Sequence, residues 1–382
     1  MERIILISNI GSTSKKYSIY KGDVEYAWFH FEQMGEDFHL SYKIESHFEK
    51  KKSTKEIYTK ALTFVKDSLN SQNVEIEYLA IRAVVPHIDF VQDKICSTEV
   101  LKDLKQILHE DPLHIQTLIL EIEEAQTFLD MNSIILVSDS SYHQTRNTDI
   151  PLTFKEPLHS IGYHGLSCES VIDILNQNKI KYSKLIIAHL GGGSSITGSF
   201  NQKSVFNSMQ FSPLGGMIMS SRSGSIDPFL ILKYQKENNL SYEKTIEHLY
   251  TKSGLLSLSG VSSDLRVVRE NALAGDIKSK KAIITFVDSI VEHILRASAH
   301  TQGIDTIVFT GTIGIRALYI RELVIEKLMW LGCSINHSRN SEVDSDCFEI
   351  STFDSKIKIY VAQIDEMKQM HKHTQSFLKN KI

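Results

Sequence analysis

Short apolar runs alternate with stretches of helical periodicity along almost the whole chain. Apolar residues recur every three or four positions at 57–69 and, in the longest such stretch, at 283–295, which predicts amphipathic helices there. Apolar runs predict strands at residues 3–9, 16–20, 78–85, 133–138, 184–189, 194–200, 305–310 and 357–361. Such alternation is typical of an α/β protein.

Two of the strand-like runs end in a turn rich in glycine and serine. The first turn spans residues 11–14 (Gly-Ser-Thr-Ser) and the second spans 191–195 (Gly-Gly-Gly-Ser-Ser). Each leads into another strand-like run, whereas phosphate-binding Walker loops and dinucleotide fingerprints lead into a helix. One such turn alone is most simply a plain hairpin. The pair predicts mixed sheets in two related domains that bind a polyphosphate between them.

Length and composition set the broad class. The 382 residues exceed a usual single domain, and the net charge of −4 gives no footprint for nucleic acid. Residues 49–52 (Glu-Lys-Lys-Lys) and 336–348 are expected to be polar loops, and His371 and His373 to lie at the surface. The chain shows no membrane-length apolar run and no signal-peptide pattern, and its four cysteines are scattered. We therefore expect a cytoplasmic protein without a membrane partner.

Three charged residues stand out against their surroundings. Arg82 lies within an apolar strand, Arg222 in a Gly/Ser-rich loop before a helix that starts near Asp227, and Asp139 directly after the apolar run 134–137. Ligands of open α/β sheets sit at the carboxyl ends of strands, so Asp139 is a candidate Mg²⁺ ligand and the arginines are candidates for binding an anion. The simpler alternatives are an arginine facing water, an Arg222–Asp227 pair and a turn or helix-capping aspartate.

Taken together, the motifs resemble those of the acetate kinase family of carboxylate kinases, from residue 4 to roughly 370. The family pattern N-x-G-S-S-S-x-K is matched by Asn9, Gly11, Ser12, Thr13, Ser14 and Lys16. Further matches are 82–84 to R-V-V, 112–114 to P-L-H, 138–145 to F-D-T-A-F-H-Q-T, 161–167 to Y-G-F-H-G-T-S, 189–193 to H-L-G-N-G, 211–216 to F-T-P-L-E-G, 221–228 to T-R-S-G-D-I-D-P and 252–260 to K-S-G-L-L-G-L-S-G.

The resemblance implies an Mg²⁺-dependent, reversible transfer of the γ-phosphoryl group of ATP to acetate, with Mn²⁺ as an alternative metal. By resemblance, the catalytic residues are Arg82, Asp139, His164, His189 and Arg222, and the metal-associated residues are Asn9, Asp139 and Glu366. The implied acyl pocket comprises Arg82, Val84, Leu113, Tyr163 and Pro213, although Leu113 alone is more simply a core residue. ATP and ADP would contact Ser12, Ser14, Lys16, His189, Leu190, Gly191, Gly192, Gly193, Asp264, Leu265, Arg266, Thr312, Ile313, Gly314 and Arg316.

The chain departs from the family pattern at three places. Pro86-His87 replaces a glycine pair beside the acyl pocket, and Gly192 replaces an asparagine that contacts phosphate. In the nucleotide loop F-T-A-G-I-G-E-N, Thr312 replaces a glycine, and Ile315-Arg316 replace the Glu-Asn pair. We expect ATP to bind with altered affinity or base preference.

The resemblance also implies the architecture, two actin-like (ribonuclease H-like) domains with a cleft between them. Domain I should comprise residues 1–141 with the terminal helix 368–382, and domain II residues 142–367. A homodimer is expected, because the family dimerises. Two alternatives to an acetate kinase remain, namely a propionate or butyrate kinase and a non-catalytic nucleotide-binding relative.

Overall fold

The chain folds into two compact units. The computed structural model describes residues 3–11, 14–146 and 158–381. The first unit runs to Ser141 and resumes at Asp365, and the second spans Tyr142–Ile364. We expected residues 365–367 in the second domain, but they belong to the first unit, because its last helix, α14 (Glu366–Lys381), begins there.

The described residues of the first unit form an eight-stranded mixed sheet in the order β5-β4-β3-β2-β1-β6-β8-β7. Its strands are β1 (Ile4–Ile10), β2 (Ser14–Lys21), β3 (Val24–Met34), β4 (Asp37–Ile44), β5 (His47–Ser53), β6 (Tyr78–Ala83), β7 (Lys94–Ile95) and β8 (Ile134–Ser138). Strands β1 to β5 form an antiparallel meander, while β1, β6 and β8 run parallel. The parallel part brings three strand ends to one edge of the sheet.

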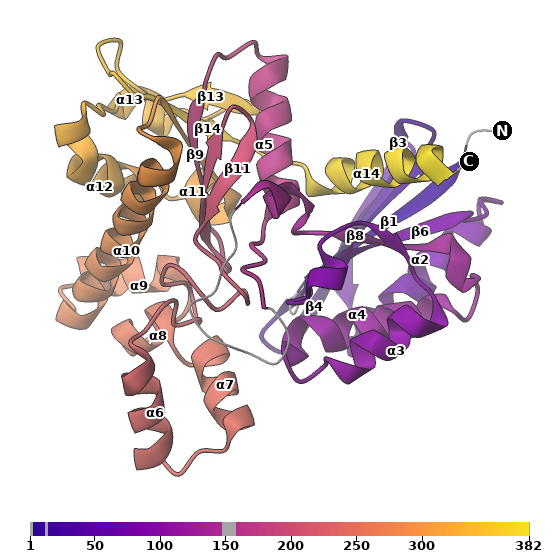
Figure 1. The fold of residues 1–382 in the computed structure, drawn as a ribbon. Helices are drawn as coiled ribbons and strands as arrows, with labels where there is room; N and C mark the ends of the chain where they lie inside the picture. The colour runs from indigo at the N-terminus through magenta and orange to yellow at the C-terminus, as the bar shows by residue number, and fades with distance from the viewer. Residues whose placement is uncertain (1–2, 12–13, 147–157, 382) are drawn as a thin grey trace. The chain divides into compact units, whose positions relative to one another are not determined.

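Helices cover both faces of the parallel strands. They are α1 (Lys55–Thr59), α2 (Ala61–Asn70), α3 (Thr98–Gln106), α4 (Pro112–Ala125) and α14, with 3₁₀ turns at Ile88–Phe90 and Met131–Ser133. Figure 1 shows α14 along one side of the sheet and α2, α3 and α4 on the other. Helix α4 begins at Pro112, because the side chain of Asp111 accepts from the backbone N–H of His114 and proline is favoured in the first turn of a helix.

The second unit repeats the strand order of the first. Its described residues form a six-stranded sheet, β11-β10-β9-β12-β14-β13. The strands are β9 (Lys184–His189), β10 (Ser195–Phe200), β11 (Lys203–Asn207), β12 (Thr306–Thr310), β13 (Cys347–Glu349) and β14 (Lys358–Ala362). As in the first unit, an antiparallel meander joins a parallel trio, here β9, β12 and β14. The mixed, duplicated α/β architecture confirms the predicted fold class.

The helices of the second unit differ widely in length, and α10 is the longest of them. They are α5 (Gly165–Gln177), α6 (Pro228–Glu237), α7 (Tyr242–Thr251), α8 (Gly254–Ser259), α9 (Leu265–Leu273), α10 (Ile277–Thr301), α11 (Gly311–Arg316), α12 (Leu318–Leu328) and α13 (His337–Ser341), with 3₁₀ turns at Ser141–Thr145 and Met329–Leu331. The predicted periodicity at 283–295 lies within α10, where Ile283, Val287, Ile290 and Ile294 are buried. They pack into the core beside the parallel strands.

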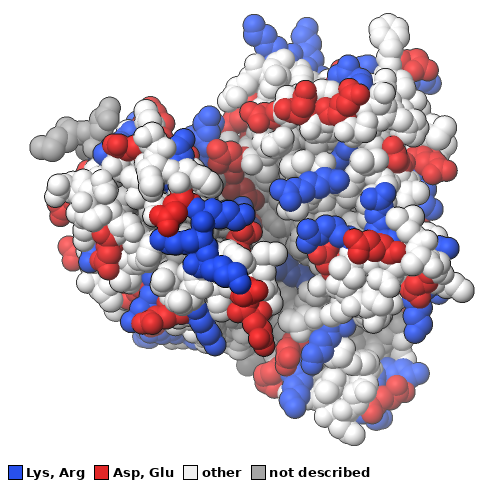
Figure 2. Space-filling view, turned by 180° about the vertical axis from the view of Figure 1, so that it is seen from behind, with Lys and Arg blue, Asp and Glu red and all other residues white. Residues whose placement is uncertain are grey.

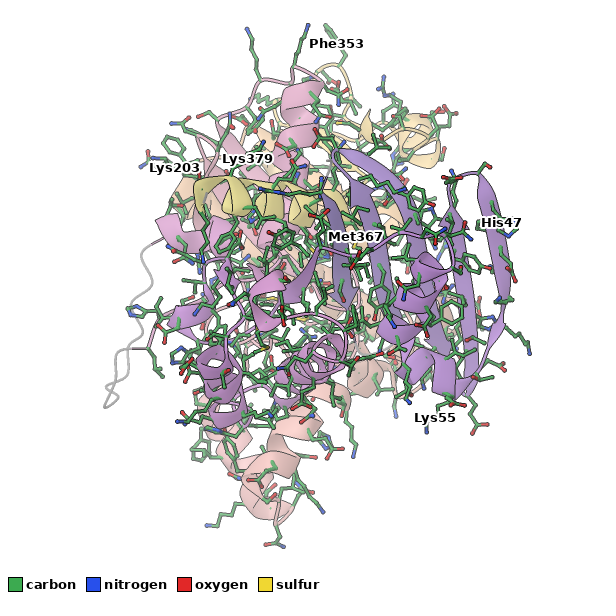
Figure 3. The ribbon with its side chains drawn as sticks, turned by 90° about the vertical axis from the view of Figure 1, so that its right-hand side faces the viewer. His47, Lys55, Lys203, Phe353, Met367 and Lys379 are labelled. Atoms are coloured by element: carbon green, nitrogen blue, oxygen red, sulfur yellow. The ribbon has the colours of Figure 1, made fainter. Side chains whose placement is uncertain are left out.

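Three local predictions were wrong, and the helical prediction for 57–69 was confirmed with a break inside it. Residues 49–52 lie in the edge strand β5, which Figure 3 shows with His47 at its start, and not in a loop. The polar stretch 336–348 contains α13 and the start of β13. The periodic stretch 57–69 is split between α1 and α2 at Lys60. His371 is buried against the ring of Tyr20, because α14 packs on the sheet.

The surface carries both signs of charge. On the face in Figure 2, Lys and Arg side chains are interspersed with Asp and Glu, and no extended field of one sign forms there. Within the described parts of the chain, no helix combines the length and the apolar character needed to cross a bilayer.

Candidate active site

In the first unit, three side chains predicted to share a site gather where the parallel strands end. Asn9 lies near the end of β1, Arg82 near the end of β6, and Asp139 directly after β8. The backbone N–H of Asp139 donates to the carbonyl of Ala83 (3.0 Å), which fixes this residue beside Arg82. The strand-end placement that the sequence predicted is therefore present.

Arg82 bridges the two carboxylates of this cluster. Its NH2 group donates to Asp139 Oδ2 (3.1 Å), and its NH1 group donates to Asn9 Oδ1 (3.1 Å) and Glu366 Oε2 (3.4 Å). Asn9 Nδ2 in turn donates to Glu366 Oε2 (2.9 Å). The simpler alternatives of an arginine facing water and a capping aspartate are wrong, because Arg82 and Asp139 bind each other.

Burial strengthens the electrostatic interactions between these charged side chains. The side chain of Arg82 is 17% exposed and that of Asp139 only 1%. Burial acts to lower the pKa of Arg82, but the carboxylates of Asp139 and Glu366 raise it above its usual value. The guanidinium is therefore permanently charged and held in a fixed orientation, as recognition of a planar anion requires.

Glu366 reaches the cluster at the first turn of α14. Figure 3 shows the neighbouring Met367 and Lys379 near the two ends of this helix. The helix packs on β1, β6 and β8, which places its first residue at the strand ends. The resemblance to the family predicted Glu366 as a metal-associated residue. The predicted end of domain II at residue 367, however, placed Glu366 in the other unit.

The donors of this cluster suit Mg²⁺. Carboxylate and amide oxygens are its preferred ligands, and it usually binds one or two carboxylates together with water and phosphate oxygens. Asp139, Glu366 and Asn9 supply that set. Across the described ranges, no group of three or more His, Cys, Asp or Glu side chains could hold an ion by itself. The residues thus fit a magnesium ion whose remaining ligands would be water and phosphate oxygens of the substrate.

A small pocket lies beside Arg82. Its apolar walls are Ile10, Val84, Leu113 and Leu118, and its volume is about 20 Å³, little more than one water molecule needs. Leu113 is 38% exposed, so the reading of Leu113 as a core residue is wrong. His114 also lines the pocket and was given no role, although the P-L-H motif pointed to it. Its Nδ1 lies 2.8 Å from Asp111 Oδ2.

The first glycine turn contributes Ser14 and Lys16 at the start of β2, and Ser12 lies outside the described residues. Ser14 Oγ lies 2.9 Å from His30 Nε2 on β3. His30 is partly buried, and burial lowers its pKa. Sequence reasoning missed this neighbour because it did not predict β3.

In the second unit, the second turn is shaped by backbone hydrogen bonds. His189 ends β9, and the N–H of Gly191 donates to Ser194 Oγ (3.1 Å). The carbonyl of Leu190 accepts from the N–H groups of Ile313 (2.8 Å) and Gly314 (3.1 Å) on α11. The turn at 190–193 and the predicted nucleotide loop are therefore directly connected.

Two histidines and an arginine surround this turn. The rings of His164 and His189 stack with centroids 4.2 Å apart, and His164 Nδ1 lies 2.9 Å from Ser195 Oγ. A Cβ atom built on Gly193 would lie 3.6 Å from both Arg222 NH1 and His164 Nε2. The structure thus brings together three of the predicted catalytic residues and the turn.

The remaining predicted residues of this unit have well-defined neighbours. Arg222 NH1 donates to the carbonyl of Pro213 (3.2 Å), and its guanidinium lies 5.6 Å from the ring centre of Tyr250. Asp227 caps the N-terminus of α6. The buried Tyr163 donates from its hydroxyl to the carbonyl of Phe211 (2.7 Å).

The predicted adenosine contacts are divided between two helices. Thr312, Ile313, Gly314 and Arg316 lie on α11, next to the turn. Asp264 caps α9 and pairs with the exposed Arg266 (2.6 Å). Leu265 packs into the core of the unit, so its side chain contributes to packing.

Comparison with known proteins decides the family. Residues 4–372 match the acetokinase family. The chain belongs to this family. An acetate kinase from Clostridium botulinum (strain Okra / Type B1) is 30% identical over 382 residues, which cover 95% of this chain and 96% of the relative. An acetate kinase from Thermoanaerobacterium thermosaccharolyticum is 31% identical over 98% of this chain and 99% of its own.

Solved structures agree with this assignment. A propionate kinase from Francisella tularensis matches with a TM-score of 0.86 and 27% identity, and an acetate kinase from Entamoeba histolytica with 0.85 and 25%. Each comparison covers 98% of this chain and 99% of the other. This acetokinase-family chain is a kinase that transfers a phosphoryl group to a carboxylate, and the clusters described above are its candidate active-site residues.

Proposed function

We propose that this chain is an Mg²⁺-dependent acetate kinase, which forms acetyl phosphate and ADP from acetate and ATP in a reversible reaction. The observation that carries the proposal is Arg82, a buried guanidinium held by Asp139 and Glu366 beside a pocket walled by Val84 and Leu113. A guanidinium binds a carboxylate in a bidentate manner, and the apolar wall accepts its methyl group.

The chemistry needs positioning and charge rather than a base. Acetate is ionised near pH 7, because a carboxylic acid has a pKa of about 4. The obstacle is the approach of two anions, which cationic side chains and hydrogen-bond donors relieve. Arg82 would orient the acetate, while Arg222, His164 and His189 would donate to the oxygens of the transferred phosphoryl group. Held by Asp139, Glu366 and Asn9, Mg²⁺ would neutralise phosphate charge.

The proposal is tested by trapping the acyl phosphate with hydroxylamine. We expect Mg²⁺-dependent turnover with the highest kcat/KM on acetate, measured against propionate and butyrate at saturating ATP. GTP and CTP belong in the same series because the 312–316 loop departs from the family pattern. A higher kcat/KM on a longer acid would reject acetate. Nucleotide binding without any turnover would favour a non-catalytic relative.

A propionate kinase is the second candidate. It is favoured by the relative from Francisella tularensis, which matches with a TM-score of 0.86 and carries that description. One methylene group changes binding in an apolar pocket by only about 1–3 kcal/mol.

We also propose that the chain forms a homodimer in which α6 takes part. This helix has no buried residue, and it exposes Phe229, Leu230 and Leu232. Apolar side chains gathered in this way are typical of an interface. Light scattering on the protein as it elutes from a size-exclusion column should give the mass of a dimer. Leu232→Lys should lower the measured mass to that of a monomer. A wild-type monomer would overturn this proposal.

A further inference from the structure

The segment 161–164 of the second unit has an unusual backbone. Gly162 has a φ of +78° and His164 a φ of +62°, on either side of Tyr163. Left-handed backbone is disfavoured for a residue with a side chain and persists only where the surroundings enforce it. His164 is also the residue whose ring stacks on His189. The structure must therefore hold this strained residue in place.

His143 holds the segment from one side. It is completely buried, its Nε2 lies 2.9 Å from the carbonyl of Tyr163, and its Nδ1 lies 2.8 Å from Ser204 Oγ. A carbonyl can only accept, so Nε2 carries the proton and Nδ1 accepts from the serine hydroxyl. Burial, and then the nearby Arg146, lower the pKa of His143 well below its usual value, so the ring is neutral.

Asn207 grips the same residue from β11. Its Oδ1 accepts from the N–H of Tyr163 (3.3 Å), and its Nδ2 donates to the carbonyl of Tyr163 (3.1 Å). Its amide is fixed further by a bond to Thr197 Oγ1 (2.9 Å) and one from the N–H of Met209 (3.0 Å), and its Nδ2 lies 3.4 Å from His143 Nε2. The side chain thus pairs with both backbone groups of Tyr163, as a neighbouring strand would.

No space remains for the segment to relax beside His143. A Cβ atom at Gly162 would lie 2.6 Å from Arg146 NH2 and 3.0 Å from His143 Cγ. Arg146 NH2 also donates to the carbonyls of Ser160 (2.8 Å) and Ile161 (2.6 Å). The glycine at 162 is therefore required both for its positive φ and for the close approach of these side chains.

We propose that His143 and Asn207 are positioning residues, which clamp the backbone of Tyr163 so that His164 keeps its left-handed conformation and its ring stays between Ser195 and His189. This inference rests on the proposed function, in which His164 contacts the transferred phosphoryl group. The proposed function assigns neither His143 nor Asn207 a contact with the reacting groups. Their effect should therefore appear in kcat rather than in substrate affinity.

The test compares two buried histidines of the same unit. His143→Leu removes the clamp, while His293→Leu removes a buried imidazole on α10 that bonds to the carbonyl of Ser289. A misplacement of about 1 Å can cost about 100-fold in rate. For His143→Leu we expect kcat to fall about 10- to 100-fold with KM values within about threefold of wild type. His293→Leu should retain wild-type kcat.

Conservative variants and a spectroscopic readout make the test specific. His143→Gln keeps an amide donor for the carbonyl of Tyr163 and should recover part of the lost kcat. In ¹⁵N-histidine NMR spectra, assigned with a His164→Gln variant, the imidazole signals of His164 should move in His143→Leu and stay in place in His293→Leu. Should His143→Leu not fold, Ser204→Ala, which removes the hydroxyl donor to Nδ1, should move the same signals.

The possible outcomes separate the two proposals. The clamp would be overturned if the His143 variants left both kcat and the His164 signals unchanged. The same result in Ser204→Ala would overturn it where that variant replaces them. Equal losses of kcat in His143→Leu and His293→Leu would also overturn it. If the wild-type chain shows no kinase turnover, the proposed function fails, and the NMR signals alone decide whether the clamp holds His164.

Discussion

The two units share a strand order but not the chemistry at their strand ends. In the first unit, Ser8 of β1 pairs with Ile81 of β6, and the next residues along these strands, Asn9 and Arg82, therefore lie side by side. At the same place in the second unit, His189 of β9 pairs with Thr310 of β12. Arg82 donates to a carboxylate, whereas Thr310 donates to the backbone carbonyl of Ala362 (2.8 Å). The duplicated scaffold thus supports a buried ion-pair cluster in one unit and a glycine turn bordered by His164, His189 and Arg222 in the other.

This difference suggests a division of labour. In the first unit, Arg82, Asp139 and Glu366 are held by one another, so each charge is positioned by its opposite. In the second unit, glycine backbone, stacked imidazoles and helix α11 provide the arrangement. The first cluster suits a small anion and a metal ion, and the second suits the oxygens of a polyphosphate.

The largest effect is expected where the charged cluster is broken. Arg82→Ala should lower turnover by on the order of 10²- to 10³-fold, because removing one preorganised donor from an active site costs about that much, and here the donor is the one proposed to orient the acetate. It also leaves Asp139 buried without its cation, so the melting temperature should fall. The hydroxylamine assay and thermal unfolding measure the two effects.

Arg82→Lys is the matched control for that loss. It keeps the charge near Asp139 but removes the bidentate fork. We expect it to recover most of the stability and little of the turnover. Full turnover in Arg82→Ala would contradict the role of this residue in the proposed reaction.

A backbone change should disrupt the glycine turn of the second unit. Gly311 has a φ of +77°, and a Cβ atom there would lie 2.5 Å from the carbonyl oxygen of Leu190. Gly311→Ala should therefore displace α11 from the turn, lower the melting temperature and weaken ATP binding at least about tenfold. Gly192→Ala is the control, because its Cβ meets nothing within 4 Å. Equal ATP affinities in the two variants would contradict this account.

Sequence patterns predicted the parts of the fold that are locally encoded. The parallel strands are continuous apolar runs, and the turns at 11–14 and 191–195 lead into strands β2 and β10. Strand β5 was not predicted, because its lysines are typical of a solvated loop. Charged residues, however, also protect an edge strand from pairing with a strand of another molecule. The break between α1 and α2 leaves the helical periodicity intact.

The candidate site was predictable only in part, for a related reason. Arg82 and Asp139 stand out because charge follows an apolar run, and that signal is local. The approach of Glu366 to Asn9 spans most of the chain and depends on how α14 packs. The contact of His143 with Tyr163 joins residues twenty positions apart, and no periodicity of the sequence reports it.

A buried carboxyl group beneath β1 distinguishes the first unit at a further position. Glu121 is almost fully buried and accepts from Ser8 Oγ (2.7 Å), whereas the position that corresponds to Ser8 on β9 is Ala188. Burial raises the pKa of Glu121 above its usual value. A raised pKa means that the stability it contributes is present below about pH 4.5 and is lost as the pH rises through the native pKa.

Glu121→Gln should therefore be more stable than wild type above pH 5. The advantage should grow by up to about 1.4 kcal/mol per pH unit until the native pKa is passed, because the amide cannot ionise and still accepts from Ser8. Urea unfolding between pH 4 and pH 8 measures it. Parallel stability curves for the two proteins would show that the pKa of Glu121 does not differ between the folded and unfolded states.

The smallest effect should come from restoring a side chain to the glycine turn at 190–193. Gly192 stands where the family pattern has an asparagine, and open space surrounds the position of its Cβ. Gly192→Asn adds one amide donor without a clash, so we expect KM for ATP to fall about three- to tenfold, as one added hydrogen bond allows. KM for acetate should not change, because the proposed reaction assigns the acetate to Arg82 of the first unit. Gly192→Leu, which adds bulk without a donor, is the control, and an equal fall in KM for both variants would exclude the hydrogen bond as its cause.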